Sequence, residues 1–153
     1  MATHPPSFRS RGRGARRRLP RALGSVAVAL TAVALTGCGA SAAREDGATD
    51  AGRRFTTAVA AGDYRAGCEL LAPETRDEVE EDAKGPCGPA LQQLGLPRAG
   101  AARGVDVYGR QALLRMTGDT LFLSLFDDGW KVVAAGCEPQ AEDEPYRCSL
   151  KGS

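Results

Sequence analysis

The spacing of apolar residues changes at Gly104, and this change limits the folds that are open to the chain. Before Gly104, apolar residues recur every three or four positions, as Phe55 and Val59 do, which is typical of amphipathic helices. From Gly104 on, apolar and polar residues alternate, as in residues 105–108, which is typical of strands with one buried face. Helices followed by strands predict an α+β fold, in which N-terminal helices pack on one face of a curved antiparallel sheet of four to five strands.

Capping and breaking residues divide the first part of the chain into four expected helices. Asp50 and Asp63 are good N-caps, Gly62 suits a helix end, and Pro73 suits the first turn of a helix. The expected helices cover residues 51–61, 64–71, 73–82 and 87–94. The third is strongly acidic and lacks the Asp-x-Asp-x-Asp-Gly pattern of a calcium loop, so we expect a solvent-exposed helix face there.

Turn residues divide the second part in the same way. Gly118 with Asp119, and Asp128 with Gly129, are strong hairpin signals. The expected strands cover residues 104–110, 112–117, 120–126, 130–135 and 146–151. Trp130 should lie in the core. The polar segment 138–145 should form an exposed loop between two cysteines, which is a reasonable place for a partner to bind.

The N-terminal residues have the features of a secretory signal. Seven arginines precede an apolar run at residues 22–36, which is about fifteen residues long. No acidic residue lies before or within this run. This run is shorter than the roughly 20 apolar residues that a transmembrane helix needs. The arginines at residues 16–18 also fit a twin-arginine signal, so the general and the twin-arginine export routes both stay open.

The apolar run ends in Leu35, Thr36, Gly37 and Cys38. This sequence resembles the lipobox of bacterial lipoproteins, which has a large aliphatic residue, two small residues and a cysteine. The resemblance implies that Cys38 receives a diacylglyceryl lipid and fatty acids such as palmitate, and becomes the first residue of the mature protein. The lipid would hold the protein on the outer face of the cell membrane.

Three segments follow from this interpretation. Residues 1–37 would be a signal peptide that is removed, residues 38–48 a flexible lipidated tether of small and polar residues, and residues 49–153 a single α+β domain. Of the 20 basic and 19 acidic residues, seven basic ones precede Cys38, which leaves a formal charge of −6 for residues 38–153. A negative charge argues against nucleic acid as a partner. The excess of arginine over lysine is typical of a high-GC actinobacterium.

Four cysteines remain once Cys38 is assigned to the lipid. Four cysteines in an exported domain predict two disulfides. Three pairings are possible, and we expect Cys68 with Cys87 and Cys137 with Cys148, because each pair is local and joins neighbouring elements. A zinc site would need cysteines two to four residues apart, which do not occur here, so we expect no metal.

Short segments spread over residues 50–153 carry a resemblance to a known fold. They are residues 61–64, 68–73, 86–87, 107–110, 118–120, 128–137 and 145–148. Together they resemble small actinobacterial lipoproteins of the nuclear transport factor 2-like, or cystatin-like, type. The resemblance implies a cone-shaped α+β fold, an extracytoplasmic location and the disulfide pairing given above. It supplies no catalytic residues.

The residues after Cys38 allow little catalytic chemistry. The only histidine is His4, so the mature chain would have no imidazole for a triad or a metal site, and no nucleotide-binding motif occurs. We therefore expect an accessory or binding protein without a cofactor, which binds a protein partner or a small apolar ligand. The alternative is an isomerase- or lyase-like enzyme with Asp106 as base and Tyr108 or Tyr64 as donor. Both Asp106 and Tyr108 could equally lie on the solvent face of their strand.

Overall fold

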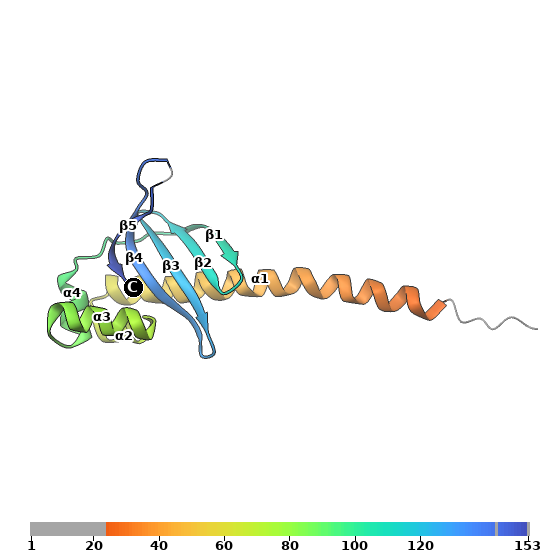
Figure 1. Cartoon of the computed structure of the whole chain (residues 1–153), viewed down its shortest axis with the longest axis horizontal. Helices are drawn as coiled ribbons and strands as arrows, with labels where there is room; N and C mark the ends of the chain where they lie inside the picture. Colours follow the sequence, from red (N-terminus) through yellow and green to blue (C-terminus); the bar gives the residue numbers. More distant parts are fainter. Residues whose placement is uncertain (1–23, 143, 153) are drawn as a thin grey trace, which may run out of the picture. The chain divides into compact units, whose positions relative to one another are not determined.

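The computed structural model describes residues 24–142 and 144–152, with side chains from residue 39 on. It divides into two units, of which the second, residues 35–153, contains the sheet and the three short helices. Figure 1 shows helices followed by a sheet, which confirms the α+β prediction. The helices are α1 (Gly24–Ala60), α2 (Tyr64–Glu69), α3 (Pro73–Ala83) and α4 (Cys87–Gln93), and the strands are β1 (Ala102–Tyr108), β2 (Gln111–Met116), β3 (Asp119–Phe126), β4 (Gly129–Glu138) and β5 (Arg147–Lys151).

Helix α1 extends much further toward the N-terminus than the expected helix at residues 51–61. It includes residues 39–48, for which we expected a flexible tether. Alanine is the best helix former and proline is absent from α1, so nothing ends the helix before Gly62, whose φ is +74°. Residues 39–46 are exposed, and burial begins at Gly47, which lies against the Trp130 indole. The packed part of α1 therefore starts close to the expected domain boundary at residue 49.

The three short helices lie where the capping residues placed them. The Asp63 carboxylate accepts a hydrogen bond from the Ala66 N–H at 3.0 Å, Pro73 occupies the first turn of α3, and Lys84 ends α3 in the left-handed region at φ 51°. The N-terminus of α4 is held by α3, because the Cys87 N–H donates to the Glu80 carboxylate at 3.3 Å. The sequence did not reveal this last contact, since Glu80 is one of many acidic residues on α3.

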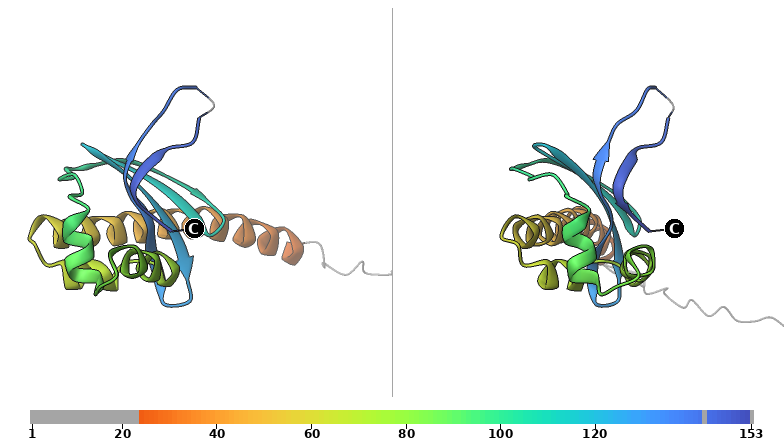
Figure 2. Two further views of the ribbon diagram at one scale, coloured as in Figure 1. Left: turned by 60° about the vertical axis from the view of Figure 1, so that its left-hand side comes forward. Right: turned by 90° about the vertical axis from the view of Figure 1, so that its left-hand side faces the viewer.

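The five strands form one antiparallel meander in the order β1-β2-β3-β4-β5. Strands that follow each other in the chain are neighbours in the sheet, as the two predicted hairpin turns require. Strands β1 and β5 are the two edges and do not pair with each other, so the sheet is open. Figure 2 shows the C-terminal half of α1 crossing one face of this sheet, with α2, α3 and α4 gathered at one end.

The hydrophobic core lies between α1 and the sheet. Phe55 from α1 is 1% exposed, and alternate residues of the strands meet it, including Leu114, Leu121 and Leu123 at 0%. Gly52 lies so close to Leu114 that a Cβ atom would overlap its side chain. Trp130 is buried in this core as predicted.

The segment between α2 and α3 joins the helical end of the molecule to the sheet. Val132 donates its N–H to the Leu70 carbonyl and accepts from the Ala72 N–H, both at 2.9 Å. The Thr75 hydroxyl donates to the Val133 carbonyl at 3.3 Å. These bonds fix the start of α3 to β4, and Thr75 also lies against Gly152, which directly follows β5.

Candidate functional site

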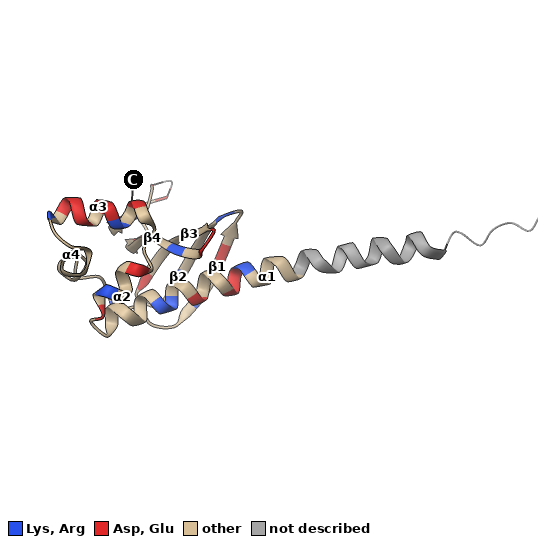
Figure 3. Ribbon diagram, turned by 90° about the horizontal axis from the view of Figure 1, so that it is seen from below, with Lys and Arg blue, Asp and Glu red and all other residues tan. Residues whose placement is uncertain are grey.

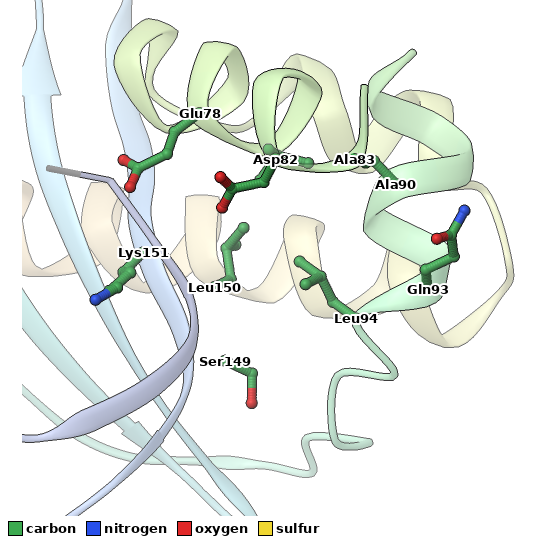
Figure 4. A pocket seen from close by; sticks show the side chains of 10 residues that line it. Glu78, Asp82, Ala83, Ala90, Gln93, Leu94, Ser149, Leu150 and Lys151 are labelled. Atoms are coloured by element: carbon green, nitrogen blue, oxygen red, sulfur yellow. The ribbon is translucent and has the colours of Figure 1, made fainter. Parts of the chain in front are cut away.

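A pocket of about 280 Å³ lies between α3, α4 and β5. Figure 4 shows both apolar and polar side chains in its lining. The apolar lining consists of Val79, Ala83, Ala90, Leu94 and Leu150, and the polar lining of Glu78, Asp82, Gln93, Ser149 and Lys151. Leu94 and Tyr108 are the large apolar residues that are exposed among the described ones, and Leu94 belongs to this pocket.

Helical and strand periodicity explain how these side chains come together. On α3, Val79 and Ala83 are four residues apart and share a face, and Glu78 and Asp82 repeat the same spacing on the adjoining face. On β5, Leu150 is buried, whereas its neighbours in the strand are exposed. Each element therefore supplies both apolar and polar residues to the lining of the pocket.

The charged residues in the lining of the pocket are two acidic ones, Glu78 and Asp82, and one basic one, Lys151. Helix α3 carries six carboxylates and one arginine, and Figure 3 shows the acidic residues spread over it. Arg76 pairs with Glu80 at 3.1 Å, on the side of α3 that faces α4 and the Cys87 N–H. Lys151 lines the pocket from β5, and Figure 4 shows its amino group pointing away from Asp82. The site offers apolar contact together with a site for a cationic group.

Both disulfides support walls of this pocket. Cys68 pairs with Cys87, which ties α2 to α4, and Cys137 pairs with Cys148, which ties β4 to β5. This is the pairing expected from the sequence. Helix α4 and strand β5 are short elements at the edge of the fold, and each is held by one covalent bond.

Asp119 is a buried carboxyl group that sequence reasoning treated only as part of a turn. It is 8% exposed, and its carboxylate accepts the Cys137 N–H at 3.2 Å. Burial raises the pKa of Asp119, although the N–H groups of Thr120, Cys137 and Gly136 oppose this effect. Gly136 has a φ of +65°, and its N–H and that of Cys137 both turn toward Asp119. Asp119 thus holds an irregular part of β4 just before the disulfide.

Asp106, Tyr108 and Tyr64, the residues of the enzyme alternative, lie on strand β1 and helix α2. Asp106 pairs with Arg115 of the neighbouring strand, and the Tyr108 side chain is 72% exposed. Val105 and Val107 pack against the core, so Asp106 and Tyr108 lie on the other face of β1. Tyr64 begins α2 and is partly buried among the helices. The structure therefore places Asp106 and Tyr108 together on the exposed face of β1 and Tyr64 on a different element, α2.

The loop between β4 and β5 is exposed, as expected, in its described part. It projects beyond the sheet in Figure 2, and the Tyr146 ring at its end contacts Phe122 edge to face, with 5.3 Å between the ring centres. This contact and the disulfide fix the base of the loop. The loop itself shows no cavity or cluster that would specify a ligand within residues 139–142 and 144–146.

Cys38, for which the sequence predicts lipid attachment, lies in α1, and its side chain is outside the described residues. Across residues 24–142 and 144–152, no helix has the length and apolar character to cross a membrane. The same residues contain no group of three or more side chains placed to hold a metal ion. No protein-family model, curated protein or solved structure matches this chain.

Proposed function

We propose that this protein is an exported accessory lipoprotein, anchored through Cys38 to the outer face of the cell membrane, which binds a protein partner through the pocket between α3, α4 and β5. The pocket is the observation that carries the binding role. The lipobox at residues 35–38 is the observation that carries the location.

The anchor and the domain are compatible with each other. Cleavage before Cys38 would remove the first part of α1 and leave its packed part, from Gly47 to Ala60, in place. Gly47 lies nine positions after Cys38, which corresponds to about 14 Å of helix. Two disulfides are also typical of a protein that folds outside the cytoplasm.

A binding role fits the pocket better than catalysis does. Asp106 pairs with Arg115 on the exposed face of β1, whereas the pocket combines apolar side chains, three of them buried, with charged groups. The cone-shaped, cystatin-like fold remains part of this proposal. The open five-stranded sheet with helices on one face is the feature that supports it.

Lipid attachment is tested by metabolic labelling of the full chain with an alkyne analogue of palmitate in a bacterial host. We expect label and membrane association for the wild type and for the control Ser41→Ala, three residues further on. Cys38→Ala should lose both, because the thiol is the only acceptor at the lipobox. Label retained on Cys38→Ala would rule out this anchor.

The binding site is tested by crosslinking on cells, with two matched substitutions. Leu94 and Tyr108 are both exposed large apolar residues, but only Leu94 lines the pocket. We expect Leu94→Arg to remove a specific crosslinked partner and Tyr108→Arg to retain it. Equal crosslinking by both variants would show that the pocket is not the binding site.

A further inference from the structure

Strand β5 is an open edge of the sheet next to the pocket. Within the part of the chain that the structure describes, β5 pairs with β4 alone. Gly152 donates its N–H to the Val133 carbonyl at 2.9 Å, and Leu150 lies opposite Ala135. Because successive residues of a strand direct their backbone groups to opposite sides, Ser149 and Lys151 direct theirs away from β4.

The pocket lies along this outer side of β5. Ser149, Leu150 and Lys151 line it from β5, Val79 lines it from α3, and Leu94 lines it from the end of α4. The volume of about 280 Å³ is at the lower limit for sites that enclose a whole small ligand, which are roughly 300–1,000 Å³. It is sufficient for one or two side chains. A small cavity beside unpaired backbone groups is the arrangement that extended peptides use when they add to a sheet.

We propose that the partner binds with an extended basic segment, which adds as a further strand along β5. The segment would place an apolar side chain between Val79 and Leu94 and a basic side chain beside Asp82. This proposal rests on the binding function proposed above and names the chemistry of the partner.

Charge favours a basic segment over an acidic one. Glu78 and Asp82 line the pocket from α3, against the single cation that Lys151 contributes from β5. The remaining carboxylates of α3 extend the negative potential beyond the pocket (Figure 3). Such a potential speeds the approach of a basic partner and disfavours an acidic one.

The probe is a capped, fluorescein-labelled heptapeptide of alternating lysine and valine. Binding is measured by fluorescence anisotropy with the full-length anchored protein in phosphatidylcholine nanodiscs, and empty nanodiscs give the background. A second peptide carries N-methyl groups on alternate residues, which removes backbone donors and leaves the side chains unchanged. A third has glutamate in place of lysine.

Addition to β5 predicts a distinct set of results. N-methylation should weaken binding about tenfold, because at least one backbone hydrogen bond is lost. Asp82→Lys should weaken it about fivefold, as expected for a partly exposed ion pair, and the control Asp127→Lys on the β3–β4 hairpin should not. The glutamate peptide should bind more weakly than the lysine peptide.

Three outcomes would overturn the proposal. Equal binding of the N-methylated peptide would exclude strand addition, and equal binding of the glutamate peptide would exclude a basic partner. Equal loss with Asp82→Lys and Asp127→Lys would show general electrostatic attraction instead of a site at β5. A further result is possible, in which Leu94→Arg removes the crosslinked partner but the lysine–valine peptide does not bind. This result would support the proposed binding function and exclude addition of a strand at β5.

Discussion

Asp119 offers the sharpest test of how the sheet is held together. Its carboxylate accepts backbone N–H groups from Thr120, Gly136 and Cys137, where β4 departs from regular pairing. Replacing it with alanine would leave these donors in a site that is almost closed to water, since Asp119 is 8% exposed. An unpaired buried donor costs about 1–3 kcal/mol.

The expected loss can be estimated by comparing two substitutions. Asp119→Ala leaves two amides of β4 without their acceptor, but it also removes a charge whose burial is unfavourable. The net decrease in the free energy of unfolding should be about 2–4 kcal/mol. Asp119→Asn keeps an acceptor oxygen of the same shape, so it should cost about 1 kcal/mol or less at neutral pH.

Urea unfolding of the purified protein, with its disulfides intact, measures both changes. Asp127→Asn is the control, because its side chain is fully exposed on a turn. The reasoning fails if Asp119→Ala costs less than about 0.5 kcal/mol, or if the alanine and asparagine variants are equally unstable.

The raised pKa of Asp119 adds a pH dependence with a definite sign. A carboxyl group whose pKa is higher in the folded state than its ordinary value of 3.8 binds protons more tightly when folded. Its contribution to stability is therefore present in full below the ordinary pKa and is lost as the pH rises through the raised value. The wild type should gain stability relative to Asp119→Asn as the pH is lowered through this window.

Melting temperatures of both proteins between about pH 7 and pH 3 measure this difference in stability. An advantage of the wild type that grows with rising pH would refute burial as the cause of the raised pKa.

Three further predictions concern the core and the disulfides. Phe55→Ala should lower the free energy of unfolding by about 3–5 kcal/mol in urea unfolding, because Phe55 is 1% exposed between α1 and the sheet; a loss below about 1 kcal/mol would contradict that packing. Replacing Cys68 and Cys87 together by alanine should cost about 3 kcal/mol, since the bond closes a loop with a sequence separation of 19, and the same assay without reductant measures it. Intact-mass measurement of the wild type should find four oxidised thiols, and free thiols at Cys137 or Cys148 would contradict the pairing.

The sequence predicts the order of elements well because local residues determine most boundaries. Asp63, Pro73 and the two hairpin turns act on neighbouring backbone groups, so their effect can be predicted without knowledge of the tertiary fold. The disulfide pairing is predictable for the same reason, because each bond joins elements that are close in the chain.

The features that sequence reasoning missed depend on contacts between distant residues. Nothing near Asp119 indicates that Gly136 and Cys137 will turn their N–H groups toward it. The pocket needs α3, α4 and β5 together, and its residues look like ordinary helix and strand positions in the sequence. The extension of α1 over residues 39–48 has a different cause, since small residues there fit both a tether and a helix.

The positions of the disulfides support the pocket as the functional part of the molecule. Within the part of the chain that the structure describes, neither disulfide joins α1 to the sheet. Both bonds are instead placed at elements that line the pocket, Cys68–Cys87 at α4 and Cys137–Cys148 at β5. A short helix and a five-residue edge strand bury little surface of their own, so without these bonds they would be the first parts to open locally. Holding them in place lowers the ordering entropy that a partner must overcome on binding. Reduction of the disulfides should therefore weaken binding at β5 before it unfolds the core.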